Sequence, residues 1–235
     1  MNRDEINRRI KFSKVRGELR SEAKISECFH FNKDECKGKI KNVHSIQRNG
    51  RLSLLEEEVN GNMNVYSFEI EPVGTKEYQL KPVGIASASA FTGFCDFHDT
   101  TLFSTIENQP FQEENDEHCF LHSYRAFAIA HHRKKEQSKA FKADIEFNRA
   151  KQDVIPEFLK GTDVGYNEGE MVRTRLNDVL RRKAYEELEY LEIRYSNLYP
   201  LASSSAMTPT HTPKTNTRLN IHQEVSVPYE YVFLT

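Results

Sequence analysis

Tryptophan is absent from this chain of 235 residues, and cysteine occurs only four times. Four cysteines are too few for the disulfide framework of a small secreted domain. No apolar run approaches the roughly 18 residues that a membrane span needs, and the N-terminus, MNRDEINRRIKFSKVR, lacks the apolar segment of a secretory signal. We therefore expect a cytoplasmic protein with no membrane partner, in which clustered cysteines bind metal or are simply buried.

Two kinds of catalytic motif are also missing. The sequence has no glycine-rich phosphate loop of the Walker or Rossmann type and no G-x-S-x-G nucleophile motif. What it does have is 37% hydrophobic residues, including 15 Phe and 10 Tyr, and this many aromatics argues against wholesale disorder. A chain of this length and composition can bury a core of its own.

The hydrophobic patterns predict an α+β protein. We expect a zinc-bearing, treble-clef or ββα-like N-terminal part over 1–110, a long-helix region over 111–200, and a Ser/Thr/Pro-rich linker with a terminal strand over 201–235. The last residues, VSVPYEYVFLT, indicate either a truncated chain or a strand that closes a sheet. Helices are predicted over 2–24, 96–106, 115–158 and 168–198, strands over 39–47 and 65–74, and loops over 28–36, over 82–95 and around Gly161 and Gly165.

The net charge of −2 conceals an uneven distribution. Residues 1–51 carry 14 Lys/Arg against 7 Asp/Glu, whereas residues 52–120 carry 2 against 13. The basic N-terminal arm either holds backbone phosphates of nucleic acid or packs against the acidic segment of its own chain. Its candidate phosphate contacts are Arg8, Arg9, Lys11, Lys14, Arg16 and Arg20, and a second set is Arg133, Lys134, Lys135 and Lys139.

Cysteine and histidine gather in one part of the sequence in a spacing suited to metal. Cys28 and Cys36 flank a loop, and Cys95 and His98 form a C-x2-H at the start of a predicted helix. Zinc takes four such ligands in a tetrahedron, so we expect these four residues to hold one structural zinc ion. His30 is an alternative ligand to Cys36. The remaining candidates are interpreted as core or ordinary helix face, namely Cys119 and the i,i+4 pair His118 and His122.

On these residues the sequence over about 25–105 resembles the HNH, or ββα-metal, nuclease family. Members with zinc have a Cys pair before a strand with a catalytic His, and a second Cys pair at the start of the closing helix. The strand here is IKNVHSIQ and the helix start is FCDFHD. The resemblance implies that His44 is the general base and Asp99 a ligand of Mg²⁺ or Mn²⁺. The chain departs from the family in the seven residues between Cys28 and Cys36, and at Val43, Ser89 and Ala90, where members have metal ligands or a central Asn.

Three functions fit this pattern. The first is an HNH-like, metal-dependent nuclease that hydrolyses phosphodiesters. The second is a non-catalytic, zinc-stabilised module that binds nucleic acid or protein. The third is an interaction protein whose long helices bind a protein partner, with zinc replacing part of a core. A His on the expected strand favours the first function, and the missing metal ligands favour the other two.

Overall fold

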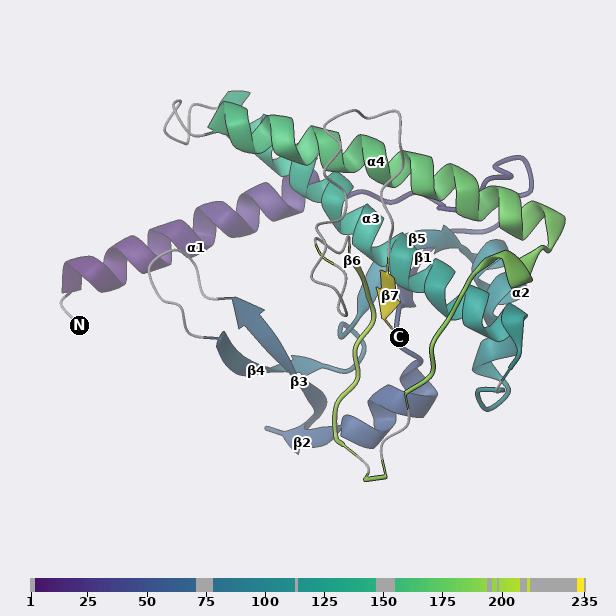
Figure 1. Cartoon of the computed structure of the whole chain (residues 1–235). Helices are drawn as coiled ribbons and strands as arrows, with labels where there is room; N and C mark the ends of the chain where they lie inside the picture. Colours follow the sequence, from purple (N-terminus) through teal and green to yellow (C-terminus); the bar gives the residue numbers. More distant parts are fainter. Residues whose placement is uncertain are drawn as a thin grey trace. The chain divides into compact units, whose positions relative to one another are not determined.

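The computed structural model describes residues 3–70, 78–112, 114–146, 155–193, 196–197, 199–207, 211 and 232–234. The protein is mixed α+β, as predicted (Figure 1). In chain order the elements are α1 (Arg3–Ala23), β1 (Ile40–His44), β2 (Glu57–Val59), β3 (Asn62–Ile70), β4 (Tyr78–Gly84), β5 (Ala90–Cys95), α2 (Asp96–Glu107), α3 (Asp116–Glu146), α4 (Ile155–Arg182), β6 (Ser205–Met207) and β7 (Val232–Leu234). Short helical turns cover Arg48–Leu52, Ser53–Leu55 and Tyr185–Glu187.

The described residues fall into two compact units, each built from more than one stretch of the chain. The first unit draws on 1–26, 130–178 and 208–230, and the second on 27–129, 179–207 and 231–235. The long helix α3 therefore contributes its first part to the second unit and its remainder to the first.

The second unit contains a ββα arrangement. Strands β1 and β5 pair antiparallel, with Ile40 opposite Cys95 and His44 opposite Ala90, and α2 begins directly after β5. The predicted strand at 39–47 and helix at 96–106 are confirmed. The loop predicted over 82–95 is wrong at both of its ends, because β4 runs to Gly84 and β5 begins at Ala90. Small residues made this segment look loop-like, and pairing with β1 outweighs that local tendency.

A long insertion separates the two strands of this pair. It forms a three-stranded antiparallel sheet in the order β2-β3-β4. Asn60 and Gly61 turn the chain between β2 and β3 with φ of 53° and 77°, the left-handed values that a tight hairpin of this kind requires. One small buried cluster supports the insertion, made of Leu52, Val65, Ile85 and Ala88.

An aromatic core lies behind the ββα arrangement. The Phe94 ring contacts that of Phe103 edge to face at 5.1 Å, and the Phe29 ring contacts that of Tyr124 at 5.3 Å. Residues Phe120, Tyr124, Phe127 and Ala128 of α3 are all buried, as their spacing predicts. The Asn115 side chain accepts the N–H of His118 at 3.1 Å and so caps α3. These contacts place the start of α3 within the core of the second unit.

Helix α4 differs most from the sequence-based expectation. The loop predicted around Gly161 and Gly165 is wrong, since α4 is continuous through both residues. A Cβ added at Gly165 would meet only the flexible end of the Lys134 side chain on α3, whereas one at Gly169 would overlap the buried ring of His131, so it is Gly169 that permits close packing of the two helices. The helix predicted to reach residue 198 ends at Arg182, where Lys183 takes a left-handed φ of 56°.

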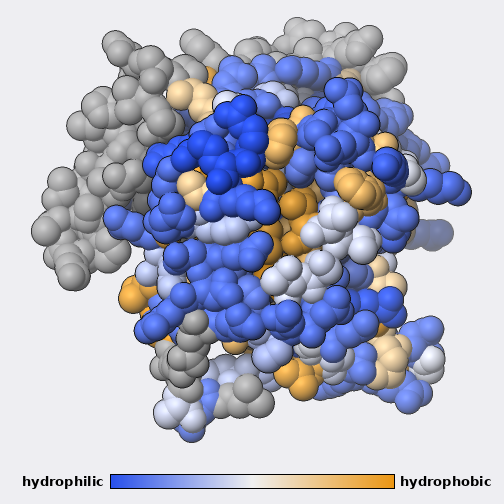
Figure 2. Space-filling model, turned by 90° about the vertical axis from the view of Figure 1, so that its right-hand side faces the viewer, coloured by the Kyte–Doolittle hydropathy of each residue, from blue (hydrophilic) through white to orange (hydrophobic). Residues whose placement is uncertain are grey.

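The remaining predictions are confirmed in part. Strand β3 covers 65–70 of the strand predicted at 65–74, and α3 covers 116–146 of the helix predicted at 115–158. Residues 71–74 and 147–154 lie outside the described part of the chain, and 155–158 belong to α4. Helix α1 covers nearly all of the helix predicted at 2–24, and β7 pairs antiparallel with β6, which is the sheet-closing alternative for the terminal strand. Within the described part of the chain, no helix has the length and apolarity that a membrane crossing demands. The face drawn in Figure 2 is mostly hydrophilic, with hydrophobic residues in small groups.

Candidate metal centre

The structure brings together the four predicted metal ligands. The ligand atoms of Cys28, Cys36, Cys95 and His98 all lie within 4.8 Å of one another. His98 Nδ1 is 3.4 Å from the Cys28 sulfur, 3.6 Å from the Cys36 sulfur and 3.2 Å from the Cys95 sulfur. Three sulfurs thus surround one ring nitrogen, so the cluster can hold a metal ion such as zinc.

These distances can be compared with those of a tetrahedral zinc site. Zinc binds sulfur at about 2.3 Å and nitrogen at about 2.0–2.1 Å, and a tetrahedral angle then separates nitrogen from sulfur by about 3.6 Å. The three separations from His98 Nδ1 are 3.2–3.6 Å. The residues therefore fit a four-coordinate site with only small adjustments. With four protein ligands the metal would have no open position, which is the character of a structural site.

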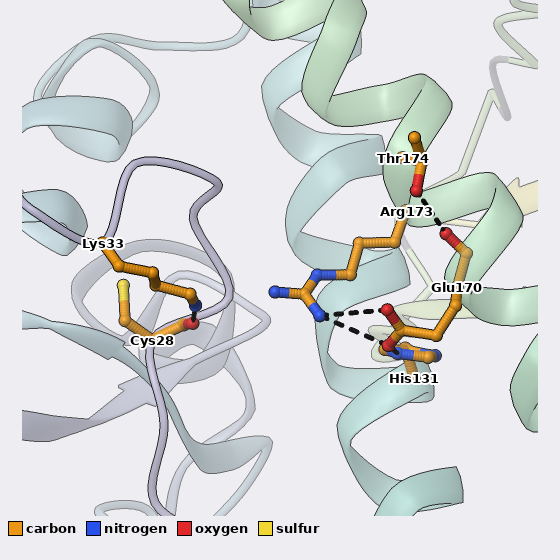
Figure 3. A network of polar contacts seen from close by, with 6 residues as sticks. All are labelled: Cys28, Lys33, His131, Glu170, Arg173 and Thr174. Atoms are coloured by element: carbon orange, nitrogen blue, oxygen red, sulfur yellow. Dashed lines mark hydrogen bonds and ion pairs between the residues drawn. The ribbon is translucent and has the colours of Figure 1, made fainter.

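Backbone hydrogen bonds hold the first cysteine loop against β5. The N–H of Phe29 donates to the carbonyl of Gly93 at 2.7 Å, and the N–H of Cys36 donates to the carbonyl of Lys33 at 3.1 Å. The Lys33 ammonium also folds back to donate to the carbonyl of Cys28 (Figure 3). The loop between the two cysteines is thus closed on itself, and both sulfurs reach the same point.

The second pair of ligands depends on the start of α2. Cys95 is the N-cap of this helix, and its sulfur accepts the N–H of His98 at 3.5 Å. The N–H of Asp96 donates to the carbonyl of Lys39 at 3.0 Å, which ties the helix start to the residue before β1. Because residues three apart lie on one face of a helix turn, Cys95 and His98 point to a common centre.

The electrostatics of the cluster suit a cation. Burial and the neighbouring Cys28 raise the pKa of the Cys36 thiol to about 12. Burial alone would raise the pKa of Cys95 as well, but the N–H groups of His98 and Lys37 that donate to its sulfur lower it overall. Burial lowers the pKa of His98, which favours the neutral imidazole that a metal needs. Several thiolates cannot coexist here without a positive charge between them.

The alternative ligand His30 lies beside the cluster and outside it. Its ring stacks on that of His98 with the centroids 3.8 Å apart, and its Nδ1 accepts the N–H of Asn32 at 3.2 Å. Burial and the neighbouring His98 lower the pKa of His30 to about 4. His30 therefore covers the ligand ring, while Cys36 fills the fourth ligand position.

The remaining cysteine and the histidine pair of α3 are not part of the metal cluster. Cys119 is buried on α3, and among the described residues no second group of three metal-binding side chains is found. His118 Nδ1 accepts the N–H of Gln112 at 3.3 Å. His118 is buried and His122 is half-buried, so the pair is less exposed than the ordinary helix face expected from the sequence, and neither residue belongs to the metal cluster.

The two predicted catalytic residues have separate surroundings. His44 ends β1, and its Nδ1 faces the carbonyl of Ala88 at 2.8 Å. Asp99 lies in the first turn of α2, where burial and the charge of Glu107 raise its pKa to about 6. Their roles as general base and metal ligand stay predictions.

One functional candidate was missed in the sequence. Arg125 of α3 has a side chain only 1% exposed, and its Nη1 donates to Glu107 Oε1 at 2.9 Å. Its guanidinium lies 5.1 Å from the centre of the Phe103 ring. No sequence signal distinguishes Arg125 from Arg133, the other arginine of α3, because the burial of Arg125 arises from tertiary packing.

The predicted nucleic-acid contacts lie in the first unit. Lys14 is exposed on α1, and the side chains of Arg8, Arg9, Lys11, Arg16 and Arg20 lie outside the described part of the structure. On α3, Arg133 and Lys139 are exposed, and Lys134 and Lys135 are half-buried. The end of α1 is tied to this part of α3, since the N–H of Ile25 donates to the carboxylate of Glu136 at 3.1 Å.

Comparisons with protein-family models, with curated proteins and with solved structures gave no match.

Proposed function

We propose that this chain is a zinc-stabilised, HNH-like protein that acts on nucleic acid by hydrolysing phosphodiester bonds. The observation that carries the proposal is the setting of His44. This residue ends the first strand of a ββα arrangement whose loop and helix start supply a three-cysteine, one-histidine cluster. The order of strand, strand and helix around the cluster is the order that the family resemblance implies.

The hydrogen bond of His44 supports a role as general base. A carbonyl oxygen only accepts, so the contact with Ala88 requires that Nδ1 carries the proton. The neutral ring then has its lone pair on Nε2. That nitrogen can take a proton from a water molecule near neutral pH, where an imidazole is best suited to the task. The same bond would also hold a purely structural histidine, so the test must be functional.

The two metals have different roles in the proposal. Zinc in the four-ligand cluster stabilises the fold. Mg²⁺ or Mn²⁺ would neutralise charge on the phosphate, and Asp99 would supply one of its ligands. Magnesium is often bound by one or two carboxylates together with substrate phosphates and water. Asp99 by itself makes only a partial site.

One observation favours a second candidate function, a non-catalytic binding module. The described residues contain no other cluster of three metal ligands, and Val43 and Ala90 stand where the family has metal ligands or a central Asn. Such a module would retain the zinc-stabilised fold. It would bind nucleic acid through the basic positions of α1 and α3, or a protein through its long helices.

A nuclease assay with matched variants separates these functions. Purified protein is incubated with single- and double-stranded DNA and RNA in the presence of Mg²⁺ or Mn²⁺. His44→Ala and Asp99→Ala should keep their zinc and lose activity by at least about 100-fold, the usual scale for a general base. His211→Ala and Asp34→Ala, which change the same residue types at exposed positions, should keep activity.

Two outcomes would contradict hydrolysis at this site. Activity that survives His44→Ala would assign the cleavage to another site or to a contaminant. A wild-type protein with full zinc content and no activity on any of the substrates would leave the binding module as the better function.

A further inference from the structure

The side chain of Arg125 is an unusual buried cation. It is 1% exposed, and one of its nitrogens, Nη1, is paired with the carboxylate of Glu107. The other two nitrogens, Nε and Nη2, are buried and have no hydrogen-bond partner among the described residues. Buried polar atoms nearly always have partners, and a buried charge without them is costly.

The two unpaired nitrogens form one edge of the guanidinium. Their N–H groups point in nearly the same direction, because the guanidinium is planar and rigid. This edge matches two oxygens of a carboxylate or phosphate, which accept two parallel hydrogen bonds from it. The centre of the Phe103 ring lies 5.1 Å from the guanidinium, and the Glu107 carboxylate pairs with Nη1. The unfilled edge is therefore presented in a fixed orientation.

Further charged groups lie around Arg125. Arg51, from the helical turn after β1, is close enough to lower the pKa of both Arg125 and His122. Burial, with these two arginines, lowers the pKa of His122 to about 3. Glu107 and Asp99 supply the opposing negative charge. The buried, unpaired edge of Arg125 is the geometric feature that an anion would satisfy, and Arg51 adds positive potential there.

The charged groups around Arg125 are connected both to the surface and to the segment that follows His44. Arg51 is exposed, and the Glu107 side chain that pairs with Arg125 is 44% exposed, so this ion pair borders solvent. The Gln47 side chain, three residues after His44, donates to the carbonyl of Glu107 at 2.6 Å. The strand end with the proposed base is thus fixed to the residue that pairs with Arg125.

We propose that the Nε–Nη2 edge of Arg125, together with Arg51, binds one phosphate-type oxyanion. Arg125 supplies the two parallel hydrogen bonds, and Arg51 supplies the exposed second charge. The naming of a nucleic-acid phosphate as the physiological source rests on the proposed function, whereas the site itself rests on the geometry around Arg125. The competing explanation is that Arg125 only fastens α3 to α2 through Glu107.

The test uses the full-length, zinc-loaded protein and inorganic phosphate as the probe. Nitrogen-15 spectra follow the Nε–H resonance of Arg125, which is assigned by through-bond correlation to the Arg125 backbone and checked by its loss in Arg125→Lys. Phosphate should shift this resonance in a saturable manner and raise the melting temperature in parallel. Arg51→Ala should weaken phosphate binding about tenfold, the loss expected for one charge-assisted contact. Arg48→Ala, which removes the same charge three residues away, should leave binding unchanged.

The results separate the alternatives. A saturable shift that Arg51→Ala weakens and Arg48→Ala does not supports the site even when Arg125→Lys fails to fold. The proposed site is refuted if the protein is folded and phosphate does not shift the Nε–H resonance. It is also refuted if Arg51→Ala and Arg48→Ala lose phosphate affinity equally, because an equal loss indicates attraction by diffuse surface charge. A short single-stranded DNA is then added as a competitor. Displacement of phosphate assigns the site to nucleic acid, and no displacement assigns it to free phosphate. Phosphate binding without nuclease activity supports this site and counts against the proposed function. Nuclease activity in a protein whose Arg125 resonance does not respond to phosphate supports the proposed function and counts against this site.

Discussion

Replacement of Cys95 by serine gives the most direct test of the metal centre. Cys95 is 1% exposed and combines two roles, because its sulfur is one of the four ligand atoms and also the N-cap of α2. Serine is a good N-cap residue, so Cys95→Ser preserves the cap and removes mainly the thiolate. Any large effect therefore reports on the metal and not on the start of the helix.

The size of the effect follows from the coupling of binding to folding. A structural zinc ion contributes on the order of 10 kcal/mol at pH 7, and a variant that no longer binds the ion loses most of this contribution. A typical domain has only about 5–15 kcal/mol of stability, so Cys95→Ser should remove a large fraction of it. We expect the variant to lose bound zinc and to unfold at clearly lower denaturant concentration than the wild type.

The assay combines metal analysis with denaturant unfolding, each with and without a chelator. Chelator should destabilise the wild type strongly and Cys95→Ser little. Cys119→Ser is the matched control, since Cys119 is also buried but lies outside the cluster, and it should retain its zinc. The reasoning is refuted if the wild type binds no stoichiometric metal, or if chelator leaves its unfolding unchanged.

Three further predictions concern other parts of the chain. Gly38→Ala should lower the free energy of unfolding by about 1–2 kcal/mol, because Gly38 has a left-handed φ of 75° and a methyl group there would lie 2.8 Å from the side chain of Asp96 on α2. An unchanged midpoint in denaturant unfolding would contradict this prediction. The hydrogen bond from His131 lowers the pKa of Glu170 to about 2, so stability from this carboxylate is present above pH 4.5 and lost as the pH falls towards 2 (Figure 3). Glu170→Gln should flatten that part of the stability profile, and an equally steep acid loss in the variant would exclude this cause. Replacement of Arg8 and Arg9 by alanine should weaken nucleic-acid binding similarly on all sequences and lessen its dependence on salt, whereas a loss confined to one sequence would contradict a phosphate contact.

The metal centre was accessible from the sequence because its signals are local. Cys95 and His98 are three residues apart and follow a buried phenylalanine at a helix start, so one short segment indicates both the residue types and their geometry. The first pair needed only a loop between two cysteines. The question of whether His30 or Cys36 is the fourth ligand required the fold, because either residue can face the site from that loop.

The errors have the opposite cause, since they lie where distant packing decides the structure. Gly161 and Gly165 are typical of a loop in isolation, but both lie within the continuous helix α4, which packs against α3 at Gly169. The segment at Ala90 looked like a loop because its residues are small, and it becomes a strand only through pairing with β1. Arg125 gave no signal at all, because a charged residue on an amphipathic helix is normally exposed.

The insertion between β1 and β5 has a consequence for the order in which the protein is made. Cys28 and Cys36 leave the ribosome about 60 residues before Cys95 and His98, which at roughly 5–20 residues per second is an interval of several seconds. During that time two thiols are present without the partners that complete a tetrahedron. The insertion meanwhile has its own small core of Leu52, Val65, Ile85 and Ala88, which can form before the metal arrives. Synthesis therefore completes the set of four ligands only after the insertion between β1 and β5 has emerged.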